Sequence, residues 1–275
     1  MRNWTRTPLA LAAGCAIAWG SSPVRAAPAG GDIAEIRARA ERGDAAAAYR
    51  LGLLYSEGPE AARDVAEGLR WFRRAAKAGN VSAMWELGHH YRLGRGVAVD
   101  GAQAVRWYRR SAEAGYAPAM YSLGLIHTLG EVVKRDDEEA LRWFRRGAEA
   151  GHASSMKSVG VMYANGDGVA RDDAEALRWY RRAAEAGDAS AMNNVGVAYA
   201  TGLGAAIDYA EAMRWYLRAA EAGSAQAMQA IGFMYANGQG VARDDDEAMR
   251  WYRRAADAGH EGARQLLDLR APIKL

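Results

Sequence analysis

The sequence is poor in the residues and motifs from which most enzyme sites are built. Only one of its 275 residues is a cysteine, Cys15, and it falls in a stretch that we expect to be removed. A chain without a thiol can form neither a disulfide bond nor a cysteine nucleophile. The motifs G-x-S-x-G, HExxH and the phosphate-binding Walker loop are also missing. We therefore expect no catalytic residue, no metal ion and no cofactor.

No charge of one sign dominates once the first 26 residues are set aside. Residues 1–26 read as an export signal, with Arg2 and Arg6, an apolar stretch from Leu9 to Trp19, and a cleavage site at Val24-Arg25-Ala26. The whole chain has 36 basic and 33 acidic residues, and the signal holds three arginines and no acid, which leaves 33 of each. A formally neutral chain gives no reason to expect a nucleic-acid partner.

A long hydrophobic run is missing as well. The apolar stretch of the export signal is too short for a permanent anchor, so we expect no integral membrane span. The alternative is a lipoprotein, because Ala12-Ala13-Gly14-Cys15 approximates a lipobox, although Ala12 stands where leucine is preferred. We expect a monomeric protein that is periplasmic or secreted, with lipid anchoring at Cys15 as the second possibility.

What the sequence does have is one unit of 36 residues, most clearly at Gly151 to Ala186. A fixed period of this length is typical of stacked repeats, each copy burying its apolar face against the next. The unit therefore predicts an all-α solenoid. The frame restarts without insertion or deletion at seven glycines: Gly43, Gly79, Gly115, Gly151, Gly187, Gly223 and Gly259. The six full repeats are 43–78, 79–114, 115–150, 151–186, 187–222 and 223–258.

Half-repeats are expected at both ends of the array. Residues 27–42 form a lead-in and a capping helix, since Asp32 to Arg42 aligns with the second half of a repeat. Residues 259–275 form a second capping helix and a tail, with the helix over His260 to Leu269. Helices at the ends of a solenoid have no further neighbour to pack against, which suits their departures from the repeat.

Each repeat is predicted to contain two helices. In the clearest copy, Met156, Val159, Gly160 and Tyr163 form one stripe of a first helix, and Gly160 would let another backbone approach closely. The loop Asn165-Gly166-Asp167-Gly168 follows, in which the two glycines supply positive φ angles. The next repeat glycine then closes the second helix in the left-handed conformation.

The second helix is predicted to start at an aspartate that occupies the same place in all six copies. A glutamate or glutamine three residues later completes the pattern of a capping box, in which each cap contributes about 1 kcal/mol. The expected caps are Asp64, Asp100, Asp136, Asp172, Asp208 and Asp244.

Six of the nine tryptophans occupy a single phase of the second helix, where we expect them to be core residues. Replacing one by alanine should cost about 3–5 kcal/mol of stability. The six are Trp71, Trp107, Trp143, Trp179, Trp215 and Trp251.

The unit resembles a known family. Its pattern is A-M-x-x-[LVI]-G-x-x-Y, then G-x-G-V-x-x-D, then A-x-x-W-[YF]-x-[RK]-A-A-x-x-G, which is similar to the Sel1-like repeat, a relative of the tetratricopeptide repeat. The resemblance covers residues 43–258 and implies a right-handed α-solenoid that mediates protein–protein contacts. Pro59-Glu60 and Glu131-Val132 lack the second loop glycine, so the loops of copies one and three are expected to differ.

By analogy with tetratricopeptide solenoids, residues of the first helix that vary between copies line a concave groove for a peptide or a partner helix. Aromatic side chains gather in the first three copies, where we expect an apolar segment to be anchored; the alternative is that these rings pack against neighbouring helices. The groove row is Tyr49, Leu53, Trp85, His89, Tyr121, Leu125, Lys157, Asn193, Gln229 and Phe233.

Three other features of the sequence suggest specific chemistry. Glu86 precedes His89-His90, which suggests metal ligands, but no matching motif or acid cluster accompanies them. Arg178, Arg181 and Arg182 form a basic ridge on the second helix, but Glu175 and Glu185 are within helical reach of them. A cysteine-rich Sel1-like branch has been linked to β-lactam binding or hydrolysis, so a β-lactam-interacting protein is the alternative function. The leading expectation is an exported interaction scaffold that acts as a periplasmic regulatory or assembly factor.

Overall fold

A computed structural model describes residues 30–58 and 63–270 of the chain. The expected export signal at 1–26, with Cys15, and the tail at 271–275 lie outside the described residues. The described part consists of fourteen helices and contains no strand. The helices are α1 (Gly30–Glu41), α2 (Ala45–Glu57), α3 (Val65–Lys77), α4 (Val81–Leu93), α5 (Gly101–Glu113), α6 (Ala117–Leu129), α7 (Asp137–Glu149), α8 (Ala153–Asn165), α9 (Asp173–Glu185), α10 (Ala189–Thr201), α11 (Tyr209–Glu221), α12 (Ala225–Asn237), α13 (Asp245–Asp257) and α14 (Glu261–Arg270).

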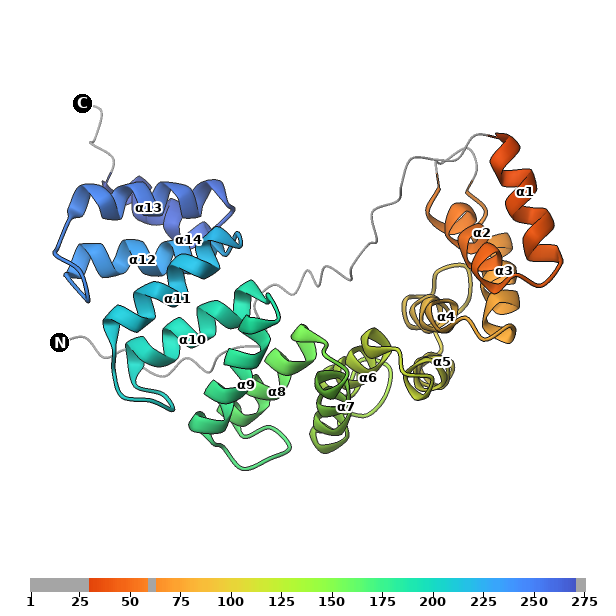
Figure 1. The fold of residues 1–275 in the computed structure, drawn as a ribbon, viewed down its shortest axis with the longest axis horizontal. Coiled ribbons are helices and arrows are strands. Elements are labelled where there is room, and N and C mark those ends of the chain that lie inside the picture. The colour runs from red at the N-terminus through yellow and green to blue at the C-terminus, as the bar shows by residue number, and fades with distance from the viewer. Residues whose placement is uncertain (1–29, 59–62, 271–275) are drawn as a thin grey trace. The chain divides into compact units, whose positions relative to one another are not determined.

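The expected all-α solenoid of six repeats is confirmed. The even-numbered helices α2 to α12 are the first helices of the repeats, and the odd-numbered helices α3 to α13 are the second helices (Figure 1). Each first helix packs against the second helix of its own repeat, for example α2 against α3 and α12 against α13. Within 30–58 and 63–270, no helix combines the length and the apolar character needed to cross a membrane.

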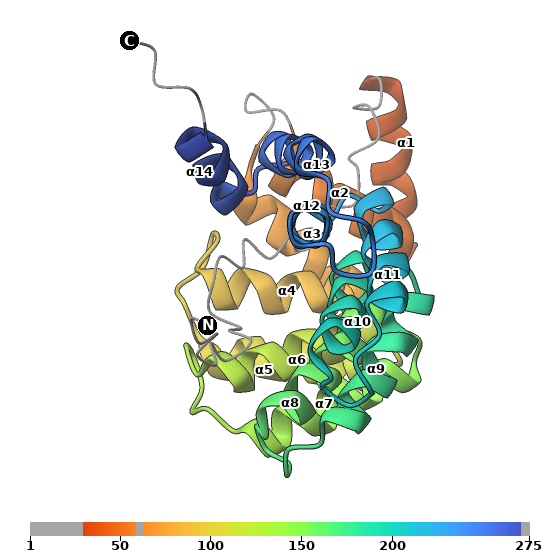
Figure 2. The ribbon, with the colours of Figure 1, turned by 90° about the vertical axis from the view of Figure 1, so that its left-hand side faces the viewer.

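The contacts divide the chain into two compact units, one ending at Ala150 and the other starting at Gly151. In the first unit, the half-repeat α1 packs against α2. In the second unit, the half-repeat α14 packs against α13 (Figure 2). The first unit therefore begins with a single helix and the second unit ends with one. Within the described residues, neither helix has a second helix of its own repeat beside it.

An aspartate stands at the start of every second helix from α3 to α13. In α9, Asp172 Oδ1 accepts a hydrogen bond from the backbone N–H of Glu175 at 2.9 Å, and the same bond recurs in all six copies. The other half of the capping box is absent, because the N–H of Asp172 donates to the carbonyl oxygen of Tyr163 in the first helix at 3.0 Å. This bond also recurs in all six copies. The aspartate therefore ties the two helices of a repeat together as well as starting the second one.

Glycines end the helices where left-handed backbone is needed. Gly187 follows α9 with φ of 90°, its N–H donates to Ala184 O, and the N–H of Asp188 donates to Ala183 O, which is the Schellman pattern. First helices end in the same conformation, at Gly166 with φ of 80° after α8. In the first copy Gly58 after α2 is instead extended, with φ of −64° and ψ of 177°; Pro59-Glu60, on which the expectation of a different loop rested, lie outside the described residues.

The glycine inside each first helix faces an aromatic ring of its own repeat. A Cβ atom added to Gly160 would lie 2.7 Å from Tyr180 Cδ1 and 3.1 Å from the carbonyl oxygen of Ala176. Gly160 therefore lets the backbone of the second helix approach closely, as expected, and the ring of Tyr180 approaches closer still. The same contact recurs in the other five copies, at Gly52–Phe72, Gly88–Tyr108, Gly124–Phe144, Gly196–Tyr216 and Gly232–Tyr252.

The tryptophans lie one residue before these rings in the sequence and are less deeply buried than the rings. Trp71, Trp143 and Trp251 are buried, whereas Trp107, Trp179 and Trp215 are only half-buried. Each of the six indole rings carries the guanidinium of the arginine three residues later, at distances from 4.1 Å for Arg254 to 5.7 Å for Arg74. The deepest aromatic layer is formed by the neighbouring tyrosines and phenylalanines, of which Tyr108 and Phe72 are completely inaccessible.

Candidate functional site

The residues of the groove row lie on the first helices and differ in how deeply they are buried. His89 and Leu125 are buried, and Phe233 is 40% exposed. The remaining members are half-buried: Tyr49, Leu53, Trp85, Tyr121, Lys157, Asn193 and Gln229.

In the first unit, the aromatic members of the row contact neighbouring rings. Tyr49 lies 5.9 Å from Phe72 and Tyr121 lies 5.7 Å from Phe144, measured between ring centroids. Trp85 meets His89 edge-on at 4.4 Å. Such packing is what the alternative interpretation of the row predicts, but Tyr49, Trp85 and Tyr121 are only half-buried.

Trp85 also connects successive first helices. Its Nε1 atom donates a hydrogen bond at 2.9 Å to Ser122 Oγ on α6, and Ser122 in turn donates to the carbonyl oxygen of Pro118. Position 85 therefore lies along the seam between α4 and α6. The sequence pattern gave Ser122 no role, because contacts between successive first helices join residues that belong to different repeats.

The half-buried aromatic rings of the second helices have a different environment from those of the groove row. Their tryptophans are covered by arginines, and in two copies the arginine two residues after the tryptophan also reaches a tyrosine of the next first helix. Arg73 Nη2 donates to the hydroxyl of Tyr91 at 3.3 Å, and Arg181 lies over the ring of Tyr199 at 5.4 Å. Within the described part of the chain, no guanidinium lies over Tyr49 or Trp85.

In the second unit, the row is more polar. Lys157 Nζ pairs with Asp188 Oδ2 at 3.2 Å, and Asp188 is also the residue that caps α10. Asn193 and Gln229 continue the row, and Phe233 ends it. The two units therefore present surfaces of different chemistry at the same repeat positions.

Lys157 belongs to a motif that the sequence analysis missed. Ser154-Ser155-Met156-Lys157 fits S-x-x-K in the first turn of α8, a pattern found at serine nucleophiles of β-lactam-binding enzymes. Here the ammonium group of Lys157 is paired with Asp188. The serine of the motif, Ser154, is half-buried, while its neighbour Ser155 is completely inaccessible and has its hydroxyl 3.0 Å from Nδ1 of His152, the residue that caps α8. These contacts serve the start of the helix and form no open site.

The side chains that suggested a metal site are directed to other partners. His90 is buried, and its Nδ1 lies 2.7 Å from the carbonyl oxygen of Arg95. Burial, together with the charges of Arg92 and Arg95, lowers the pKa of His89 to about 3. Among the described residues, no three potential ligand side chains come together around a possible ion.

Glu86 lies in an unusual setting on α4. Burial raises the pKa of its carboxyl group to about 7; the charge of Glu57 raises it as well, and that of Arg95 opposes the shift. Burial also raises the pKa of Tyr49, and the charge of Glu86 adds to that effect. Glu86, Glu57 and Tyr49 are therefore close enough to sense one another's charge at the junction of α2 and α4.

Replacing Glu86 by glutamine is expected to stabilise the protein by about 1–2 kcal/mol at pH 8 and by much less at pH 4. The pKa in the folded state lies above the ordinary value of 4.5, so the stabilisation by the protonated acid is complete below about pH 4.5 and is lost as the pH rises through about 7. Urea unfolding at pH 4, 6 and 8 would measure the difference. Glu67→Gln, on the exposed side of α3, is the control; equal effects of Glu86→Gln at pH 4 and pH 8 would contradict the prediction.

The arginines of the second helices form ion pairs within their own helix. Arg178 pairs with Glu175 at 2.6 Å, and Arg70 pairs with Glu67 at 3.1 Å. The same pair recurs at Arg214–Glu211 and Arg250–Glu247. This face is therefore a mixed, solvated surface as well as a basic one.

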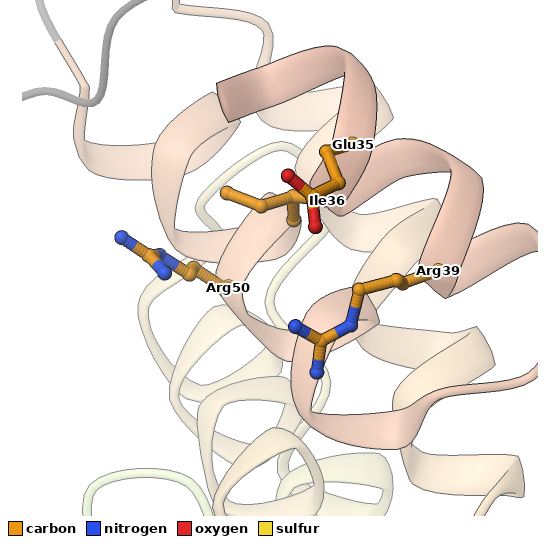
Figure 3. A pocket seen from close by; sticks show the side chains of 4 residues that line it. All are labelled: Glu35, Ile36, Arg39 and Arg50. Carbon is orange, nitrogen blue, oxygen red and sulfur yellow. The ribbon is translucent and has the colours of Figure 1, made fainter. Parts of the chain in front are cut away.

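A shallow pocket lies at the start of the first unit. Figure 3 shows that it is lined by Glu35, Ile36 and Arg39 of α1 and by Arg50 of α2. Arg39 is held by Asp44, whose Oδ2 lies 2.7 Å from Nη2 of Arg39. The pocket contains no nucleophile and no proton-transfer pair, so nothing in it points to chemistry.

Comparison with known proteins agrees with the repeat pattern. The family model described as "Sel1 repeat" matches residues 45–80, 81–116, 117–152, 153–188, 189–224 and 225–260. No curated protein matches the chain.

Three solved structures illustrate the similarity. The protective antigen c5321 of uropathogenic Escherichia coli strains, described as displaying an SLR fold, is 36% identical with a TM-score of 0.79; the match covers 86% of this chain and 51% of the antigen. This chain thus spans about half the length of that antigen. A Sel1 repeat protein from Oxalobacter formigenes is 33% identical with a TM-score of 0.72, over 82% of this chain and 99% of the other. An immunity protein from Pseudomonas aeruginosa is 18% identical with a TM-score of 0.52, over 83% and 88%, which indicates a shared fold alone.

Proposed function

The chain belongs to the Sel1 repeat family, and we propose that it is an interaction scaffold that holds a peptide or a partner helix along its groove row. Sel1 repeat proteins generally mediate protein–protein interaction. One observation supports the row as the contact surface: Tyr49 and Trp85 are half-buried rings without a guanidinium over them, whereas the second-helix tryptophans are all covered. Partly accessible aromatic rings are the residues that most often anchor a partner.

Replacing Tyr49, Trp85 and Tyr121 together by alanine is expected to weaken binding of a partner peptide about tenfold or more. The peptide would be selected on the wild-type protein from a random display library, and its affinity measured by calorimetry. Phe233→Ala tests the second unit at a position exposed enough to leave the fold intact. The control is Arg178→Ala with Arg214→Ala, on the opposite side of the second helices. Unchanged affinity in the triple variant, with helicity retained, would reject the groove row as the binding surface.

We also propose that the protein is exported, on the strength of the pattern in residues 1–26. In a bacterial host, the mature protein is expected in the periplasm or the medium, beginning at Ala27. Fractionation with intact-mass measurement would test this expectation. A mass that corresponds to a lipid-modified chain beginning at Cys15 would support the lipoprotein instead, and an unprocessed chain in the cytoplasm would rule out both.

No enzymatic activity is proposed. Sel1 repeat relatives are typically non-enzymatic, and the β-lactam-linked branch depends on paired cysteines, whereas this chain has one cysteine in total. The S-x-x-K motif on α8 lends that alternative little support, because the ammonium group of Lys157 is paired with Asp188.

A further inference from the structure

The residue that caps the first helix of a repeat differs from copy to copy. Asp44 caps α2, Asn80 caps α4, Asp188 caps α10 and Ser224 caps α12, each through a side-chain oxygen. The start of α8 is capped by His152 instead. The oxygen of an aspartate, asparagine or serine accepts a hydrogen bond throughout the pH range near neutrality, whereas an imidazole nitrogen accepts one only while it carries no proton.

His152 caps α8 through its ring nitrogen Nδ1. This atom accepts a hydrogen bond from the backbone N–H of Ser155 at 3.2 Å and lies 3.0 Å from the hydroxyl oxygen of the same serine. The N–H of Ser155 is shared with the carbonyl oxygen of His152, at 3.0 Å. Nδ1 must therefore carry a lone pair, and the proton of the neutral ring is on Nε2. The same bond precedes α14, where Nδ1 of His260 accepts from the N–H of Ala263 at 3.1 Å.

The surroundings of His152 favour the neutral ring. The side chain is half-buried, and burial lowers the pKa of the imidazole. Two charged groups act on it: Asp188 at the start of α10 raises the pKa, and Lys157 on α8 lowers it. These two groups pair with each other at 3.2 Å, so their effects on the ring oppose one another. Among the described residues, α9, which packs against α8, supplies none of the charges that act on this ring.

We propose that His152 makes the start of α8 sensitive to pH: in mild acid the imidazole takes up a proton at Nδ1, the cap is lost and the first turn of the helix loosens. A protonated Nδ1 is a donor that faces the N–H of Ser155, and its positive charge lies at the positive end of the helix dipole. This inference goes beyond the proposed function, because the device needs no partner.

The direction of the effect follows from the two states of the chain. Because the pKa of His152 is lowered in the folded protein, the unfolded chain takes up the proton first as the pH falls. The stability of α8 is therefore complete above the ordinary pKa of 6.5 and is lost as the pH falls from there through the folded-state pKa.

Hydrogen–deuterium exchange of the full-length protein tests the proposal. Wild type, His152→Asn and His152→Ala are compared at pH 7.5 and at pH 5.0, always at equal pH so that the intrinsic exchange rates match. Asparagine already fills this place in α4, where Asn80 Oδ1 accepts from the N–H of Ala83 at 2.8 Å. Peptides that contain residues 155–158 should be about fivefold better protected in wild type than in His152→Ala at pH 7.5, and equally protected in the two at pH 5.0. His152→Asn should keep its protection at both pH values.

Two further measurements complete the test. Peptides from α12, which is capped by Ser224, should be protected equally in all three proteins, and His260 is unchanged in each of them. An NMR titration of wild type should show His152 protonated on Nε2 at pH 7.5, with a pKa below its ordinary value of 6.5. The proposal is overturned if wild type and His152→Ala are equally protected at pH 7.5 or differ by the same factor at both pH values. It is also overturned if His152→Asn loses protection in acid as wild type does, or if the neutral ring carries its proton on Nδ1.

Discussion

Replacing Tyr108 by alanine is expected to lower the free energy of unfolding of the first unit by about 3–5 kcal/mol. Tyr108 on α5 is completely inaccessible, and its ring packs against Gly88 of α4 and lies 5.4 Å from the ring of His89. The loss combines the buried area of the ring with the cavity left where two helices meet. Urea unfolding followed by circular dichroism would measure it.

The matched control is the tryptophan that precedes Tyr108 on the same helix. Trp107 is half-buried, and one side of its indole is covered by the guanidinium of Arg110 at 4.7 Å rather than by the core. Replacing Trp107 by alanine should therefore cost about 1–2 kcal/mol, and not the roughly 3–5 kcal/mol expected from the sequence for a core tryptophan, because less area is buried and the exposed stack contributes little. A larger loss for Trp107 than for Tyr108 would show that the indole, and not the phenol, is the main core residue of the repeat.

Replacing Gly88 by alanine is expected to destabilise the protein by about 1–3 kcal/mol, although alanine is the better helix former. A Cβ atom at this position would lie 2.5 Å from both Cδ1 and Cε1 of Tyr108, a distance that two carbon atoms cannot keep. The ring must move, and it is enclosed on all sides. Urea unfolding followed by circular dichroism would show whether Gly88→Ala lowers or raises the free energy of unfolding.

Gly147 provides the comparison for Gly88. It lies inside the second helix α7, at a phase where four other copies carry alanine: Ala75, Ala183, Ala219 and Ala255. Replacing Gly147 by alanine should stabilise the protein by up to about 1 kcal/mol through helix propensity. Stabilisation by both substitutions would mean that the ring of Tyr108 does not occupy the space beside Gly88.

The two sites should also be coupled. When Tyr108 is already alanine, the methyl group of Gly88→Ala enters space that the ring has left, so its cost should disappear or reverse. A double-mutant cycle is expected to give a coupling energy of about 1–2 kcal/mol, within the range found for residues in direct contact. Additive effects would contradict the contact.

Local chemistry made much of this fold predictable. The 36-residue period is visible directly in the sequence. The start of each second helix at an aspartate and its end at a glycine depend on atoms only a few residues apart. Asp172 and Glu175 need one turn of helix to form their hydrogen bond, and Gly187 needs its own positive φ angle. Such rules hold whatever lies beside the helix, which is why they can be read from the sequence.

The sequence by itself determined the helices, their ends and the repeated pairing of first with second helix. Only the tertiary structure decided that Tyr108 lies deeper than Trp107, that the N–H of Asp172 donates to the carbonyl oxygen of Tyr163, and that Glu86 is half-buried. Each of these depends on atoms brought together from different helices. A helical period gives the face on which a residue lies, but the neighbouring helix sets its depth, its partner and its charge.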